Sequence, residues 1–362
     1  RMDYDLIVVK TLERVYKNYY YIIRGEIMGY KIGSFNLRNL GLTALGNENA
    51  RDLKKIADII RKENFDVVAL QEILSEGKAF TSKGYAKNSI LMELGPNWDF
   101  QWADAETSLA DTRNEGYAFV WNTKRLQLAK TTSANHVERT FVPRICRINK
   151  ESMMRRPYYA RFTPVGTLGG GPWAEFRLLC IHTYYGKDTT VDRAIRNHEL
   201  DVLMTDIYPQ IADRVYGNNM PHYTILLGDY NVELHRDWKD ALRVKQNLSR
   251  KLNGQSPLPK PAVISDIIES TKWGERSIRT VQDEFTTLKA VDNKNGIVEE
   301  DEGSRGYSHD YDHFSYEEKQ FEGVQMRVKR IDAVRKYCND DFEEYLKTVS
   351  DHIPIMMDIE LK

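Results

Sequence analysis

Two polar side chains follow an apolar run in the segment from residue 222 to residue 231, which reads His-Tyr-Thr-Ile-Leu-Leu-Gly-Asp-Tyr-Asn. The run predicts a buried strand that ends in a sharp turn at Gly228. Asp229 and Asn231 are then expected at the carboxyl end of the strand, where layered α/β proteins bind ligands. A carboxylate and an amide at this spacing can hold a hard cation and a phosphate oxygen together. Because Gly, Asp and Asn are also favoured in turns, this segment taken alone is better explained as a turn.

The same combination of an apolar run and a terminal polar group recurs along the chain. The groups are Asn36, Glu72, His182, Asp229 with Asn231, and Asp351 with His352. A single group of this kind is usually structural, but five of complementary chemistry favour one composite site. The carboxylates suit a divalent cation, the two histidines suit proton transfer, and amides and arginines suit phosphate oxygens. The set therefore predicts metal-assisted hydrolysis of a phosphoester.

Alternating strands and helices are expected to position these groups. The predicted strands cover residues 31–36, 65–72, 98–102, 113–121, 155–162, 176–182, 222–229 and 280–288, with a last strand entered at 349–355. The predicted helices cover residues 53–60, 88–94, 192–211 and 236–262, the first of them capped by Asn49. We expect 155–162 to be an edge strand because Pro157 lies at its start. The polar stretch 131–154 is expected to be a surface loop with four basic residues, Arg139, Arg144, Arg147 and Lys150.

Composition narrows the class of protein. The formal net charge of the 362-residue chain is −1, so phosphate binding must come from local arginines and metal and not from a global basic field. Three cysteines are too few and too scattered for a disulfide framework or a zinc site, and Cys180 is expected in the core. No apolar run reaches membrane-spanning length. We expect a cytoplasmic monomer, or a secreted protein if a signal peptide has been lost upstream of Arg1.

The first 27 residues differ from the rest of the sequence. Tyr19, Tyr20 and Tyr21 lie among charges without a clear period or capping signal. Two interpretations are equally good: residues 1–27 are a translated leader before a natural start at Met28, or they form an extra N-terminal helix. Without a convincing linker further on, residues 28–362 are expected to form a single catalytic domain.

Taken in order, eight motifs resemble the endonuclease/exonuclease/phosphatase superfamily, which has the DNase I-like fold, and especially its bacterial DNase I-like nucleases. They are Ser-Phe-Asn (34–36), Leu-Gln-Glu (70–72), Asn-Glu-Gly-Tyr (114–117), Arg-Arg-Pro (155–157), Ile-His-Thr (181–183), Gly-Asp-Tyr-Asn (228–231), Tyr-Asp-His-Phe (311–314) and Ser-Asp-His-Ile-Pro-Ile (350–355). The resemblance covers residue 28 to the C-terminus. It implies an α/β fold, a four-layer α/β/β/α sandwich in which two mixed sheets pack face to face with helices outside.

The resemblance also implies a role for each residue of the set. Glu72 would be the main Mg²⁺ ligand, with Asn36 and Asp351 completing the metal site and Mn²⁺ or Ca²⁺ as alternative ions. His182 and His352 would flank the scissile phosphate, oriented by Glu115 and Asp312 respectively. Asp229 and Asn231 would orient water and hold the phosphate. Arg155 would neutralise a phosphate oxygen, with Arg156 and Arg113 as further contacts.

Departures from the family patterns bear on the substrate. Nucleases similar to pancreatic DNase I grip the minor groove with an arginine and a tyrosine where this chain has Leu74 and Arg113. The motifs of inositol-polyphosphate 5-phosphatases are absent from the sequence. We therefore expect a Mg²⁺-dependent nuclease, a DNA endonuclease first of all. The alternative is a phosphodiesterase or phosphatase for lipid or small phosphoesters, and a catalytically inactive binding module is disfavoured by the intact residue set.

Overall fold

The computed structural model describes residues 28–40, 51–74, 89–105, 115–132, 138–149, 152–166, 173–187, 189–217, 220–233, 252, 254, 271–273, 276–281, 284–288, 291–292, 296–297 and 306–361. Four predictions concern residues outside these ranges: the leader 1–27, the Asn49 cap, and the contacts of Arg113 and Lys150. Apart from residues 252 and 254, the predicted helix over 236–262 also lies outside them.

Two mixed β-sheets form the centre of the molecule. The first contains β17 (Gln325–Arg330), β18 (Ile355–Leu361), β1 (Met28–Leu40), β2 (Val67–Ile73), β4 (Gly116–Asn122) and β3 (Trp98–Asp104), in that order. The second contains β12 (Thr271–Trp273), β13 (Arg276–Val281), β16 (Asp312–Glu317), β11 (His222–Asp229), β10 (Glu175–His182), β9 (Tyr158–Pro164) and β5 (Leu126–Leu128), with β8 (Arg144–Ile145) also paired to β9. Two small hairpins are β6 (Lys130–Thr132) with β7 (Glu138–Thr140) and β14 (Val291–Asp292) with β15 (Gly296–Ile297).

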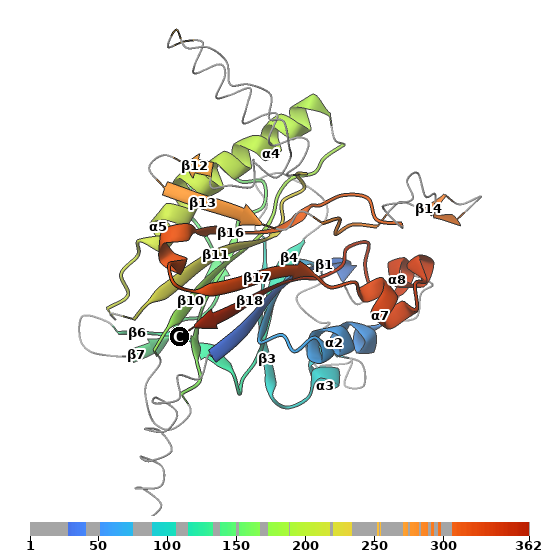
Figure 1. The fold of residues 1–362 in the computed structure, drawn as a ribbon, viewed down its shortest axis with the longest axis horizontal. Coiled ribbons are helices and arrows are strands. Elements are labelled where there is room, and N and C mark those ends of the chain that lie inside the picture. Colours follow the sequence, from blue (N-terminus) through green and yellow to red (C-terminus); the bar gives the residue numbers. More distant parts are fainter. Residues whose placement is uncertain are drawn as a thin grey trace, which may run out of the picture.

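Helices cover the outer faces of both sheets (Figure 1). The first sheet is covered by α2 (Leu53–Lys62), α3 (Ile90–Leu94), α7 (Ala333–Cys338) and α8 (Phe342–Thr348). The second is covered by α4 (Thr190–Val202), a π-helical stretch over Leu203–Ile207 and α5 (Tyr208–Ala212). A short 3₁₀ helix, Glu318–Phe321, follows β16. This arrangement is the predicted four-layer α/β/β/α sandwich.

Strict alternation of side chains explains the layering. In β2, Val67 and Ala69 belong to the core between the sheets, whereas Val68 and Leu70 belong to the core under the helices of the first sheet. Successive side chains of a strand point to opposite faces, so a strand with an apolar residue at every position is buried on both sides. The site residues Glu72, His182 and Asp229 lie at or next to the carboxyl ends of β2, β10 and β11.

The structure corrects several local predictions. Strand β9 is an interior strand, buried at every position and paired on both sides, and not the edge strand expected from Pro157. Pro157 precedes the strand, so it costs the ladder no hydrogen bond. The expected surface loop over 131–154 contains most of the β6–β7 hairpin and β8. Asp52 caps α2, since its side chain accepts a hydrogen bond from the Lys55 backbone. Strand β17 and helices α7 and α8 were not predicted.

A buried charge cluster in the second sheet leads to a stability prediction. Glu175 on β10 accepts hydrogen bonds from Arg161 Nε on β9 at 3.0 Å and from Arg177 Nε at 2.7 Å. All three side chains are almost fully buried. Replacing Glu175 by Gln leaves two buried guanidinium groups without an anion, and we expect this to lower the free energy of unfolding by about 3–5 kcal/mol in urea titrations.

The pH dependence provides the control for this prediction. Burial raises the pKa of Glu175, but Arg161 and Arg177 outweigh it and hold the pKa below the usual 4.5. The stabilisation is therefore complete above the unfolded pKa and is lost as the pH falls through the folded pKa. The gap between wild type and Glu175→Gln should narrow on acidification, while the exposed control Glu343→Gln should change stability by less than about 0.5 kcal/mol. An equal loss in both variants would contradict the role of the cluster.

Candidate active site

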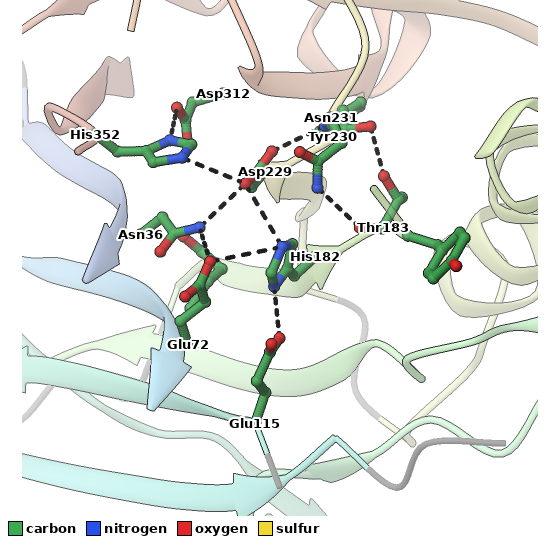
Figure 2. Close-up of polar contacts among 12 residues, drawn as sticks. Asn36, Glu72, Glu115, His182, Thr183, Asp229, Tyr230, Asn231, Asp312 and His352 are labelled. Atoms are coloured by element: carbon green, nitrogen blue, oxygen red, sulfur yellow. Dashed lines mark hydrogen bonds and ion pairs between the residues drawn. The ribbon is translucent and has the colours of Figure 1, made fainter. Parts of the chain in front are cut away.

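The predicted site residues meet because parallel strands end at the same edge of each sheet. In the first sheet Asn36 on β1 pairs with Gln71 on β2, which places Glu72 one residue beyond. In the second sheet His182 on β10 pairs with Asp229 on β11. Figure 2 shows Asn36 and Glu72 facing His182 and Asp229 across the gap between the sheets. Glu72, His182 and Asp229 line one pocket of about 990 Å³, and Asn36 lies buried behind them.

The backbone at these strand ends adopts conformations that are rare elsewhere. Gly228 has φ 146°, and a Cβ atom there would lie 2.0 Å from the carbonyl oxygen of Ile181 on β10. Only glycine permits this close approach, which explains the first residue of the Gly-Asp-Tyr-Asn motif. Glu72 and Asn231 have φ of 57° and 50°, in the left-handed region. Strained residues of this kind cluster at functional sites, where surrounding contacts hold them.

Asp229 occupies the centre of the site. Its Oδ2 accepts a hydrogen bond from Asn36 Nδ2 at 3.0 Å, and its Oδ1 accepts one from the Asn231 backbone at 2.8 Å. The Nε2 atoms of His182 and His352 lie 3.6 and 3.7 Å from the same Oδ2. Burial raises the pKa of Asp229, and the two imidazole rings oppose that rise. The carboxylate thus lies between two groups that can exchange protons with a substrate.

A carboxylate lies behind His182, as expected from the resemblance. Glu115 Oε2 lies 3.2 Å from His182 Nδ1. Burial raises the pKa of Glu115, but His182 and Arg155 outweigh it and lower that pKa to about 2. Burial and Arg155 lower the pKa of His182, yet Glu115 and Asp229 outweigh them and raise it above 6.5. Glu115 is therefore ionised and favours the protonated form of the ring.

His352 has an equivalent partner in the second sheet. Asp312 Oδ2 lies 2.7 Å from His352 Nδ1. The carbonyl oxygen of His352 accepts a hydrogen bond from the Tyr345 hydroxyl of α8, which fixes the backbone. Burial lowers the pKa of His352, but Asp312 and Asp229 outweigh it and raise the pKa well above its usual value. Both rings therefore direct Nε2 towards Asp229, because a carboxylate engages Nδ1 in each case.

Glu72 is the residue best suited to bind a metal ion. Its Oε1 accepts from Asn36 Nδ2 at 3.0 Å and its Oε2 accepts from the Asn39 backbone at 2.9 Å, which leaves further lone pairs towards the pocket. Among the residues that the structure describes, no group of three or more His, Cys, Asp or Glu side chains is arranged to hold a metal ion. Mg²⁺ does not need such a group, because it keeps several waters and binds one or two carboxylates together with substrate phosphate. The donor set fits such an ion.

The other two predicted metal ligands have protein partners. Asn36 is fully buried, its Nδ2 bridges Glu72 and Asp229, and its Oδ1 accepts from the Arg38 backbone at 2.9 Å. In this arrangement Asn36 holds two carboxylates in place, and its role as a ligand stays a prediction. Asp351 lines the pocket and forms an ion pair with Arg38 at 3.3 Å. A cation bound to Asp351 would compete with this arginine.

Of the predicted phosphate-binding arginines, the two that the structure describes, Arg155 and Arg156, lie in different surroundings. Arg155 lines the pocket, but its Nε pairs with Glu115 at 2.8 Å and its Nη1 donates to the Thr183 carbonyl at 3.3 Å. Its first role is thus to hold Glu115, which the sequence did not suggest. Arg156 is not among the described residues that line the pocket; its backbone nitrogen donates to Ala105 next to β3. Arg113 lies outside the described residues.

Several residues in or next to the pocket were not predicted from the sequence. Buried Glu199 on α4 accepts hydrogen bonds from the Met154 and Tyr184 backbones at 2.7 and 2.8 Å, and burial raises its pKa. His309 lines the pocket and pairs with Glu233, although no sequence motif singled it out. Glu233 could have been found, because it continues the alternation of Asp229 and Asn231. Nothing in the sequence relates a helical Glu199 to the strand ends. His313 of the Tyr-Asp-His-Phe motif is buried, and its Nε2 lies 3.0 Å from the Val232 carbonyl oxygen, so it has a packing role.

Comparison with known proteins agrees with this geometry. Residues 33–274 match the Endonuclease/Exonuclease/phosphatase family. The chain belongs to this family of phosphoric ester hydrolases, whose members generally depend on a divalent metal ion. A search of curated proteins found no match. In the described residues, no helix is both long and apolar enough to span a membrane.

Solved structures share the fold at low sequence identity. The structure of ANGEL2, a 2′,3′-cyclic phosphatase, is 12% identical with a TM-score of 0.51, covering 92% of this chain and 96% of that one. A mannosyl-6-phosphatase of Bacteroides thetaiotaomicron is 14% identical with a TM-score of 0.46, covering 91% and 99%. Truncated TDP2 of Caenorhabditis elegans is 15% identical with a TM-score of 0.48, covering 92% and 98%. The likeness to ANGEL2, at 12% identity, concerns the fold alone.

Proposed function

We propose that this protein is a Mg²⁺-dependent phosphodiesterase that hydrolyses nucleic acid, with DNA as the first candidate. The observation that carries the proposal is the position of Asp229 between two histidines that are each backed by a carboxylate, with Glu72 opposite (Figure 2). Two separate imidazoles suit a reaction that takes a proton from water and gives one to a leaving oxygen. Hydrolysis of a phosphodiester needs both transfers.

Each residue then has a defined task. Asp229 and Asn231 orient the attacking water and the phosphate between the two strand ends. One histidine Nε2 accepts the proton of the water while the other protonates the leaving oxygen, and Glu115 and Asp312 keep both rings in the required orientation. Bound at Glu72, with Asn36 and Asp351 nearby, Mg²⁺ would stabilise the charge that develops on the phosphate and the leaving oxygen.

The substrate prediction is cleavage of single-stranded or distorted DNA at least as fast as intact duplex. Leu74 stands where similar nucleases place a minor-groove arginine, so no described contact favours a regular duplex. The cationic residues that line the pocket, Arg38, Arg155 and Lys187, are few, and the first two already have carboxylate partners. Each phosphate contact adds about −0.9 to the salt slope on duplex DNA and about −0.7 on single strands, so the slope should be shallow.

Matched single- and double-stranded oligonucleotides, digested with Mg²⁺ across a salt series, test this preference. RNA, sphingomyelin and inositol phosphates assayed in parallel test the substrate class. Strong preference for regular duplex with a steep salt slope would refute the strand preference alone. Hydrolysis of a lipid or inositol phosphate without cleavage of any nucleic acid would overturn the proposed function.

A further inference from the structure

An aromatic wall lines the pocket next to the two histidines. It consists of three rings: Tyr185, His309 and Tyr311. Tyr185 lies three residues after His182, and Tyr311 directly precedes Asp312, the partner of His352. The Tyr185 and Tyr311 rings are 6.1 Å apart and inclined by 54°, whereas His309 is stacked on Tyr311 at 4.7 Å and 3°. Tyr185 therefore lies just beyond the end of β10, which carries His182, and Tyr311 lies just before β16, which carries Asp312.

Each ring is held in place by protein contacts. The guanidinium of Arg196 lies 5.1 Å from the centre of the Tyr185 ring, and Arg196 also donates to the Asn231 carbonyl. Glu233 pairs with His309 Nδ1, and the Thr286 and Thr287 backbones donate to the His309 carbonyl at 2.7 and 3.0 Å. The rings are therefore preorganised relative to Asp229 and not free to turn away.

The exposure of the wall indicates a ligand. Tyr185 is 39% exposed where it lines the pocket, and the His309 side chain is exposed to the same extent. Planar aromatic faces held open to solvent beside a phosphate site are suited to stack another planar ring. Arg196 behind Tyr185 adds a fixed positive charge to that stack, as in proteins that bind single strands.

We propose that this wall stacks an unpaired nucleobase of the nucleotide that carries the scissile phosphate. The inference rests on the proposed function and specifies the substrate: a base can reach Tyr185 only when it has left the helical stack, so single strands, ends and distorted sites are preferred. Stacking is tolerant of sequence because every base has a planar face. The wall therefore selects for an unpaired nucleotide and not for a particular base.

Two chromogenic diesters test the proposal with the full-length protein and Mg²⁺. Thymidine 5′-(p-nitrophenyl phosphate) carries a base, whereas methyl p-nitrophenyl phosphate does not, and both release the same phenolate. Tyr185→Leu should lower kcat/KM for the thymidine ester about 5- to 100-fold, chiefly through a higher KM. The same variant should change kcat/KM for the methyl ester less than about twofold. Tyr185→Phe, which keeps the ring, should retain the preference. The matched control Trp173→Leu removes an aromatic residue that is 38% exposed and is not among the described residues of the pocket wall. It should leave kcat/KM for both diesters unchanged.

A binding measurement separates the two proposals. Calorimetry should show that thymidine 5′-monophosphate binds more tightly than 2-deoxyribose 5-phosphate to wild type, and that Tyr185→Leu removes the difference. Equal binding of the two by wild type, or equal losses on both diesters in Tyr185→Leu, would overturn the base-stacking wall while leaving the phosphodiesterase intact. Failure of wild type to hydrolyse either diester or any oligonucleotide would overturn the proposed function and this inference with it.

Discussion

Glu72→Gln is expected to lower kcat by about 10²–10³-fold or more while the protein remains folded. Gln has the same shape and can still accept the hydrogen bond from the Asn39 backbone at 2.9 Å. It lacks the negative charge that a hard divalent cation requires, so the loss should come from the metal and not from the fold. Turnover in a Mg²⁺ titration and binding of Mn²⁺ by water-proton relaxation measure the two effects separately.

The exposed Glu322→Gln serves as the charge-matched control and should behave like wild type in both measurements. Circular dichroism and the urea midpoint establish that Glu72→Gln is folded. Undiminished turnover of wild type in excess chelator would refute the metal requirement. Normal Mn²⁺ binding by Glu72→Gln would refute the assignment of Glu72 as the principal ligand.

Removal of either imidazole should lower the rate by about 10²–10⁴-fold, because proton transfer in the transition state is worth that much. His182→Ala and His352→Ala each remove an Nε2 within 3.7 Å of Asp229 Oδ2. Single-turnover kinetics at saturating substrate should place the loss in the chemical step. The double variant should lose less than the product of the two single effects, since the residues act as a unit.

The carboxylates behind the histidines give a graded control. Glu115→Gln and Asp312→Asn should each lower the rate less than deletion of the histidine they contact, because they orient the ring and do not move the proton to substrate themselves. A rate for Glu115→Gln at or below that of His182→Ala would contradict this order.

The motifs in the sequence were sufficient to predict the layers of the fold, through their resemblance to a known family, and the apolar pattern of the strands agrees with that prediction. Strands such as β2 have apolar residues on both faces, and this pattern requires cover on both sides whatever the rest of the chain does. The same pattern moves polar groups to strand ends, so Glu72, His182 and Asp229 could be recognised as members of one set. The residue types of this set, and their short spacing from apolar runs, can be read directly from the sequence.

Only the tertiary structure decided which atoms face each other. Asn36 and Asp229 are 193 positions apart in the chain, and the hydrogen bond between them depends on the packing of two sheets. Arg155 looked like a phosphate ligand, but the fold places it against Glu115, where it stabilises the carboxylate behind His182.

The residues that other elements place in or near the site could not be predicted from the sequence either. Glu199 holds the backbone of Tyr184, a residue of the pocket, from helix α4, and His309 lines the pocket from the segment just before β16. The alternation of a strand determines which face a side chain takes, because that depends on bonds between neighbouring residues. Which residue it meets there depends on the relative placement of whole elements, and that is determined by the packing of the complete core.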